Sequence, residues 1–268
     1  MKALYQHLLL EFRCGWRNRS LLLIYYLFPL AFYLMMGLVM TELIPEFRSF
    51  MIPAMILFTI LSGEILGLPN PLVEAREAGV LRSYRINGIS ATSALGVSML
   101  TAIIHSVVAS TLIALSAPTL FGAIPPASWS AMVLVTLVAA SAYAGLGALI
   151  GVVSTSSRTT IMWSQLVYMP SFLLGGVMIP SEMLPATMSR VGLFMPTTHA
   201  MYAYRALAYG EAVPHHVWSG LVTLMAGGAL AFALAIFLFR WDTHYNEPLR
   251  YPFLAATCLL PYALWLFS

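Results

Sequence analysis

Long, uninterrupted runs of apolar residues recur along this chain and are separated by short polar segments. A helix of about 20 apolar residues crosses the hydrocarbon core of a bilayer, which is roughly 30 Å thick. Six runs of this kind are present: 21–41, 50–69, 93–116, 129–153, 161–180 and 217–239. The runs show no two-residue alternation, which favours helices over the strands of a β-barrel. The pattern therefore predicts an all-α membrane protein with six spans.

Two further segments flank this six-span domain, which we place at 21–241. Residues 1–20 carry large apolar residues at every fourth position, which is typical of an amphipathic helix lying on the membrane surface. The C-terminal extension, 242–268, contains an apolar stretch at 251–267. Seventeen residues suffice for a nearly upright helix, so we expect a seventh span there, with a re-entrant hairpin as the alternative.

The longest connection between runs, 181–216, is also apolar and is interrupted by prolines. Non-helical backbone at membrane depth is tolerated where protein shelters it. We therefore expect the part from 181 to 210 to form short helices that re-enter the outer leaflet after span five.

Composition and charge support a membrane protein and suggest its orientation. The chain is 60% hydrophobic and 9% charged, which is far more apolar than a soluble domain. If the N-terminus is cytoplasmic, only Arg48, Arg190 and Arg205 of the thirteen Lys and Arg residues fall in outer segments. Basic residues concentrate on the cytoplasmic side of membrane proteins. We expect a multi-pass protein of the cell (inner) membrane with a cytoplasmic N-terminus.

The segment between the second and third runs is unusually charged. Five charged residues lie within the fifteen positions 74–88, interleaved with apolar ones. Because the residue before a proline disfavours helix, Asn70-Pro71 is expected to end the second span. A short helix over 72–86 would follow. A solvated loop would not need apolar residues among its charges, so we expect this helix to contact a partner; a structural loop anchored at the interface is the alternative.

The sequence contains no recognisable catalytic motif. There is no H-E-x-x-H and no G-x-S-x-G, and the single lysine, Lys2, rules out a G-x-x-x-x-G-K-[ST] phosphate-binding loop. His105 lies in a predicted span without other ligands at a spacing suited to metal, so we expect it to pack or to form a hydrogen bond. We expect no catalytic residue, metal or cofactor on this chain; any nucleotide hydrolysis requires another chain.

Two features lie inside the predicted spans. Glu64 is the only acid well within an apolar run, and a charge at mid-bilayer costs roughly 2.5–3.5 kcal/mol on insertion scales. A role in a transport pathway or gate and a structural role near the interface both remain open for Glu64. Gly147 and Gly151 form a GxxxG pattern in the fourth run, which predicts close contact between helix backbones.

Two sequence segments resemble the membrane component of type-2 ABC exporters, in which a separate ATPase subunit drives a six-span permease. Arg76-Glu-Ala-Gly-Val-Leu81 is similar to the R-E-x-G-x-L signature that follows span two in that family. Gly175-Gly-Val-Met-Ile-Pro180 and the segment from Met195 to Arg205 resemble its fifth-span exit and re-entrant outer segment. The resemblance covers about residues 1–241, and the C-terminal extension departs from the family pattern.

The resemblance implies a homodimer or heterodimer of permeases with two ATPase subunits, which would bind ATP and Mg. The segment 72–86 would be the coupling helix, and the residues that would couple to the ATPase are Glu74, Arg76, Glu77, Gly79, Leu81 and Tyr84. Spans two and five would line the pathway, for which positions suggest Phe58, Glu64, Tyr168, Met169 and Phe172.

The expected substrate is an amphipathic or hydrophobic molecule, with membrane lipid but no nucleic acid as a further partner. Two other classes of function remain as alternatives. One is an ion-coupled secondary transporter, which Glu64 alone would support. The other is an intramembrane enzyme using Glu64, His105 or His199.

Overall fold

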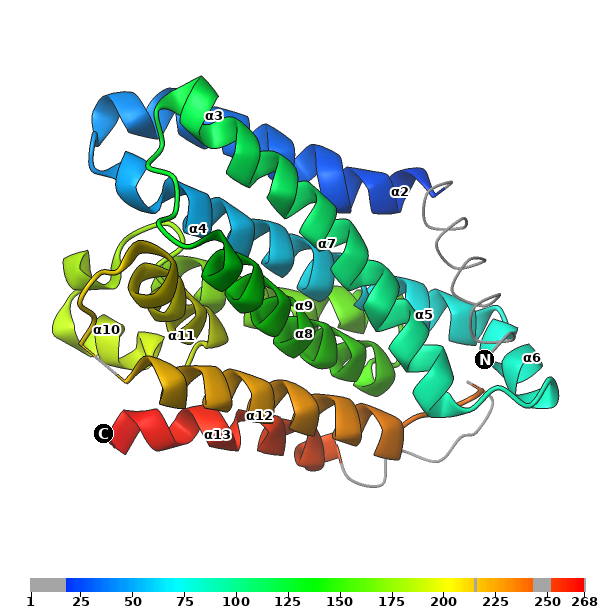
Figure 1. Cartoon of the computed structure of the whole chain (residues 1–268). Coiled ribbons are helices and arrows are strands. Elements are labelled where there is room, and N and C mark those ends of the chain that lie inside the picture. Colours follow the sequence, from blue (N-terminus) through cyan, green and yellow to red (C-terminus); the bar gives the residue numbers. More distant parts are fainter. Residues whose placement is uncertain (1–17, 215, 243–251, 268) are drawn as a thin grey trace.

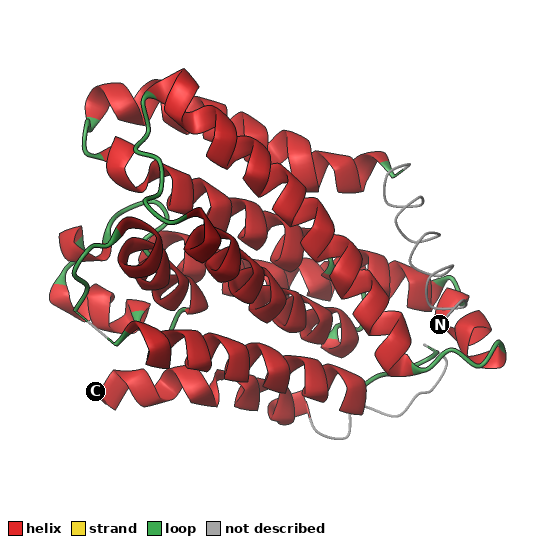
Figure 2. Cartoon of the chain, viewed as in Figure 1, coloured by secondary structure: helices red, strands yellow, loops and turns green. Residues whose placement is uncertain are grey.

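The computed structural model describes residues 18–214, 216–242 and 252–267, and every regular element in these ranges is a helix (Figures 1 and 2). The amphipathic helix predicted at 1–20 lies outside the described residues except for its last three positions. The all-helical class predicted from the hydrophobic pattern agrees with this architecture.

Five of the described helices are long and apolar enough to cross a membrane: Arg19–Leu43, Phe47–Glu77, Ala91–Phe121, Trp129–Val153 and Val217–Phe237. They correspond to predicted spans one to four and six. The predicted fifth span, 161–180, contains helix α9, Ser157–Leu174. This helix begins in a polar turn with Arg158 and carries Gln165 in its middle, which makes it less apolar than the other five. A sixth crossing at α9 remains a prediction.

The first two long helices each contain a π-helical segment. The first is built from α2, η1 and α3 (Arg19–Leu22, Leu23–Leu27 and Phe28–Leu43). The second is built from α4, η2 and α5 (Phe47–Ile60, Leu61–Gly67 and Pro69–Glu77). In each, a backbone N–H donates to the carbonyl five residues back, Phe28 to Leu23 and Leu68 to Gly63. A proline follows directly in both cases. Because proline has no N–H for the α-helical bond, the preceding turn widens.

The second helix does not end at Asn70-Pro71 as predicted from the sequence. Pro69 begins α5, and both Pro69 and Pro71 lie in its first turn, where backbone N–H groups have no helical partner in any case. The helix therefore continues to Glu77. The single helix predicted over 72–86 is instead two helices, α5 and α6 (Val80–Ile86), separated at Gly79.

Helix α8 (Trp129–Val153) lies at the centre of the bundle and contacts α7 (Ala91–Phe121), α12 (Val217–Phe237), η2 and α5. Small residues make these contacts close. A Cβ added at Gly147 would lie 2.0 Å from the Glu64 carbonyl oxygen, and one at Gly145 would lie 2.4 Å from the Gly228 carbonyl oxygen. The close approach predicted from the GxxxG pattern is confirmed as a contact within the chain.

The segment between α9 and α12 folds into short helices at one end of the bundle (Figure 1). These are η3 (Ser181–Met183), α10 (Ala186–Gly192), α11 (Pro196–Ala203) and η4 (Tyr204–Ala208). Every residue of α11 is buried, and α11 packs against α8, α9 and α12. The short helices predicted for 181–210 are present, and their re-entry into the membrane remains a prediction.

The C-terminal segment runs back along α12 in the opposite direction (Figure 1). It comprises η5, α13 and η6 (Pro252–Leu259, Leu260–Ala263 and Leu264–Phe267). At about 2.0 Å per 3₁₀ residue and about 1.5 Å per α residue, it extends for about 30 Å, the thickness of the hydrocarbon core. The 3₁₀ turns thus give a short segment the length that a seventh span needs.

Side chains fasten this segment to α12. The ring of Tyr262 lies against Gly227, where an added Cβ would be 2.4 Å from the ring. The Trp265 indole N–H donates to the Thr223 hydroxyl at 2.9 Å. The C-terminal extension is therefore a packed part of the bundle over these residues.

Candidate functional site

Helix α6 lies at one end of the bundle (Figure 1), and charged and apolar side chains are exposed there. Ile86 is 79% exposed, and Val80 on the same short helix is also exposed. The charged side chains around them are exposed as well: Glu74, Glu77, Arg82 and Arg85. We call this set of six residues the α6 surface. Large exposed apolar residues among charges are typical of a surface that binds another protein.

Gly79 sets the direction of α6. Its φ of +72° is in the left-handed region, which favours glycine, and an added Cβ would meet no described atom within 4 Å. The glycine is therefore required by the backbone turn and not by crowding. Leu81 is buried and Tyr84 is half-buried, so these two side chains attach α6 to the bundle while its other face stays exposed.

Arg76 points into the bundle instead of outward. Its guanidinium donates to the carbonyl of Val152 at 3.1 Å and also to the carbonyl of Ser154. These carbonyls belong to the C-terminal end of α8, which lacks helical partners for them and carries a partial negative charge. Arg76 therefore joins α5 to the end of α8. Its role in the arrangement is to hold the base of α6 in position.

Three of the residues predicted for a pathway lie together. The ring of Phe58, which is buried, has its centroid 5.5 Å from that of Phe172 and 6.4 Å from that of Tyr168. Phe32 stacks on Phe58 at 4.0 Å, and Phe28 lies 5.3 Å from it. We call these five residues the aromatic cluster; it joins α3, α4 and α9.

The sequence reasoning missed Phe28 and Phe32, although the aromatic-rich first run was a usable signal. Met169, predicted for the same pathway, is half-exposed on the surface of α9. Further apolar side chains on this helix are exposed with it: Ile161, Met162, Trp163, Leu166 and Leu173. In the single chain, α9 therefore presents a broad apolar face beside the aromatic cluster.

Glu64 lies in a different environment from the aromatic cluster. It is fully buried in the π-helical segment η2, and the Ser106 hydroxyl of α7 donates to its Oε1 at 3.0 Å. A π-helical turn often marks a functional position, and here it turns the carboxyl toward α7. The neighbouring His105 accepts or donates a 2.7 Å bond between its Nδ1 and the Tyr26 hydroxyl. Polar side chains thus link η1, η2 and α7.

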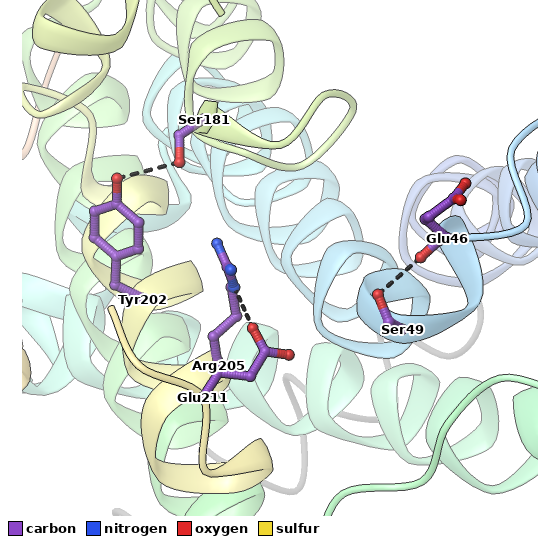
Figure 3. Close-up of polar contacts among 6 residues, drawn as sticks. All are labelled: Glu46, Ser49, Ser181, Tyr202, Arg205 and Glu211. Carbon is purple, nitrogen blue, oxygen red and sulfur yellow. Dashed lines mark hydrogen bonds and ion pairs between the residues drawn. The ribbon is translucent and has the colours of Figure 1, made fainter. Parts of the chain in front are cut away.

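The opposite end of the bundle is stabilised by polar contacts around α11 and η4 (Figure 3). The Arg205 Nε donates to Glu211 Oε2 at 2.6 Å, and the hydroxyls of Ser181 and Tyr202 lie 3.1 Å apart. Arg205 and Glu211 border a cavity of about 180 Å³ together with Glu46 at the start of α4. His199, one of the alternative catalytic candidates, is buried, with its Nε2 2.8 Å from the Leu193 carbonyl oxygen.

Within the described ranges, no group of three His, Cys, Asp or Glu side chains is arranged to hold a metal ion. The described residues instead form an exposed short helix at one end, an aromatic cluster inside and a fully buried short helix, α11, at the other end.

Known proteins similar to this chain are transport proteins. The family model described as ABC-2 family transporter protein matches residues 42–237. The putative transport permease YvfS of Bacillus subtilis (strain 168) is 25% identical over 249 residues, which are 90% of this chain and 98% of that protein. The inner membrane transport permease YhhJ of Escherichia coli (strain K12) is 33% identical over 95 residues, 35% of this chain and 25% of that protein. No solved structure gives a significant match.

The matched region extends from the end of the first long helix to the end of α12. It contains the α6 surface, helix α11 and three residues of the aromatic cluster, Phe58, Tyr168 and Phe172. The resemblance found in the two sequence segments is thereby confirmed over most of the chain. With its multi-pass helical architecture, this chain belongs to the ABC-2 family of transporter membrane proteins.

Proposed function

We propose that this chain is the membrane-spanning permease subunit of an ATP-driven exporter in the inner membrane. The energy would come from ATP and Mg bound by a separate ATPase subunit, and the cargo would be an amphipathic or hydrophobic molecule. The observation that carries the proposal is the α6 surface, which exposes Val80 and Ile86 among four charges at one end of the bundle.

The α6 surface is the proposed docking site for the ATPase. A ligand or partner shifts a two-state bundle only if it contacts the two states differently, so movement of the ATPase needs a mechanical connection to the spans. The connection proposed here runs from α6 through Gly79 to α5. Arg76 then transmits the displacement to α8 through the carbonyls of Val152 and Ser154.

The aromatic cluster is the proposed border of the transport pathway. Its rings offer an adaptable apolar surface on α3, α4 and α9, next to the exposed apolar face of α9. We propose that a second permease subunit, identical or related, packs along α9, so that Phe58, Tyr168 and Phe172 border the joint between two copies. Two ATPase subunits would then serve the two α6 surfaces. Glu64, which bonds to Ser106, has a structural role in this scheme.

The positive charge at the α6 end supports a cytoplasmic location for that end. Arg82 and Arg85 lie between the second and third long helices, and Arg76 lies in the last turn of the second. Basic residues in short loops favour the cytoplasmic side. In the proposed topology, an odd number of crossings separates this loop from α11. The loop and α11 therefore lie on opposite sides of the membrane, with α11 on the outer side and the N-terminus inside.

Reconstitution tests this proposal. The chain is co-expressed with the ABC ATPase that the proposal requires, sought in the neighbouring reading frames, and uptake of an amphipathic fluorescent dye is measured in inverted membrane vesicles. We expect copurification of the two chains and dye accumulation that requires ATP and both subunits. Dye movement by this chain alone, driven by a proton gradient, would instead support the ion-coupled alternative.

A further inference from the structure

A cavity of about 230 Å³ lies where four elements meet near the base of α6. The N-terminal element contributes Leu21 and Tyr25, α5 contributes Leu72, and α6 contributes Leu81 and Tyr84. The remaining wall is α7. The cavity is separate from the aromatic cluster, because none of the five rings of that cluster lines it.

One wall of this cavity is a polar stripe on α7. Ser98, Thr101 and His105 all line the cavity, and their spacing of three and four residues places them on one face of the helix. Thr101 is 7% exposed, and its hydroxyl has no hydrogen-bond partner among the described residues. A buried hydroxyl without a partner is costly, typically about 1–3 kcal/mol in proteins. The Thr101 hydroxyl can therefore form a hydrogen bond with a molecule that enters the cavity.

The described part of the lining offers no counter-charge to a charged ligand group. None of the fifteen described lining residues is Asp, Glu, Lys or Arg, and His105 already shares its Nδ1 with the Tyr26 hydroxyl. An ion that left water for this site would lack a counter-charge, which carries a large desolvation penalty. The chemistry that fits is an uncharged group able to donate and accept hydrogen bonds.

The size of the cavity and its surroundings indicate the rest of the ligand. Sites for whole drug-sized molecules typically measure about 300–1,000 Å³, whereas a cavity of about 150 Å³ holds benzene. The volume of about 230 Å³ therefore admits a small headgroup and its first carbons. Many of the remaining lining side chains are apolar, among them Leu68, Leu72 and Leu81, so they can surround the first carbons of a hydrocarbon chain.

We propose that this cavity binds the headgroup of a neutral membrane amphiphile, one that carries hydroxyl groups on a hydrocarbon chain, as a monoacylglycerol does. The Thr101 hydroxyl bonds to a hydroxyl of the headgroup, and the apolar side chains of α5 and α6 surround the first carbons. The bound molecule bridges α6 to α7. The site is thus distinct from the proposed pathway and depends on no assumption about transport.

Photo-crosslinking of the full-length chain in phosphatidylcholine nanodiscs tests the site. The probe is a monoacylglycerol with a diazirine in its acyl chain near the headgroup, and mass spectrometry locates the labelled peptides. We expect labelling of residues 68–75 or 98–105. Ala102→Phe fills the cavity and should reduce this labelling on the order of tenfold, which corresponds to about 1.4 kcal/mol. Val108→Phe, which introduces the same side chain on the exposed face of α7, should leave labelling unchanged.

Two further experiments test the chemistry of the ligand and provide a variant that is expected to fold normally. Thr101→Val keeps the side-chain volume and removes the hydroxyl, so it should lower labelling several-fold in a folded protein. A phosphatidic acid with the same diazirine tail should label these peptides weakly. Equal labelling in Ala102→Phe and the wild type, equal labelling by the anionic probe, or displacement of the probe by free glycerol would each overturn the proposal.

Discussion

Both ends of this bundle hold short helices, α6 at one end and the segment with α10 and α11 at the other, yet α6 and α11 differ in what they bury. Helix α6 exposes most of its residues, and its attachment depends on Leu81 and Tyr84. At the other end, α11 is buried along its whole length. Both segments interrupt the run of long helices, but only one of them is packed as a core.

This difference indicates that one part of the fold can contribute stability while another part binds a regulating partner. The buried helix α11 adds apolar contacts and hydroxyls that form hydrogen bonds. Changes in α11 should therefore first affect the free energy of unfolding. An exposed short helix contributes little to that free energy. Changes on the α6 surface should therefore leave stability intact and alter the response to a partner. Matched substitutions at the two ends test this contrast.

The largest effect is expected for Ile86→Asp. A charge in the middle of a docking surface should lower ATP-driven transport at least about tenfold, because an apolar contact is lost and an unpaired charge is buried on binding. The matched control is Ile124→Asp, in the connection between α7 and α8 at the other end, where Ile124 is 51% exposed. Its transport and the thermal unfolding of both variants should equal those of the wild type. Equal losses at the two positions would contradict the contrast.

Gly79→Ala should give the next largest effect. The left-handed conformation costs an L-residue about 1–2 kcal/mol, so α6 would turn in another direction or be strained. Gly122→Ala carries a similar conformational cost, because Gly122 has a φ of +65° and open space around it at the other end of α7. Thermal unfolding should shift by a similar amount in both variants, whereas dye uptake should fall several-fold only in Gly79→Ala.

Thr197→Val tests the buried end. The Thr197 hydroxyl donates to the Ser171 carbonyl at 2.9 Å in a buried site, and its loss should lower the free energy of unfolding by about 1–2 kcal/mol. Thr119→Val removes a hydroxyl bond of the same length in an exposed turn, and should cost under about 0.5 kcal/mol. Denaturation of the purified chains followed by circular dichroism measures both. A larger loss of unfolding free energy in Thr119→Val than in Thr197→Val would show that burial does not determine how much the lost hydrogen bond costs.

The smallest effect is expected for Glu211→Gln. The Arg205–Glu211 pair is partly exposed, with side-chain exposures of 23% and 36%, so solvent screens it. Such a pair contributes about 0.2–1 kcal/mol. The unfolding temperature should drop slightly in low salt, and the difference from the wild type should shrink in high salt. An undiminished difference in high salt would indicate a contact that is not electrostatic.

Local patterns in the sequence predicted much of the fold. Continuous apolar runs identified the five long helices, because burial in a bilayer demands unbroken helices of fixed length. Gly147 was correctly predicted to bring backbones together. The end of the second helix was predicted wrongly, since Pro71 was read as a stop although a first-turn proline costs the helix nothing.

The candidate site was less accessible to sequence reasoning, because its contacts join residues far apart in the chain. Arg76 was predicted to couple to the ATPase, but its contacts could not be foreseen, because the carbonyls that it bonds to lie 75 to 78 positions away at the end of α8. Phe32 belongs to the aromatic cluster because it packs against Phe58 and Phe172, which lie far from it in the sequence. The exposure of Ile86 likewise depends on how Gly79 directs α6, which local hydrophobicity does not reveal.

Docking of a partner on the α6 surface is tested most directly by cysteine accessibility. Ile86→Cys and Ile124→Cys are each introduced into a background in which Cys14 and Cys258 are replaced by serine, and maleimide labelling is followed with and without the ATPase subunit and ATP. We predict that the ATPase protects position 86 from labelling and leaves position 124 fully reactive. Unchanged labelling at 86 with the ATPase bound, or protection at 124 alone, would contradict the account.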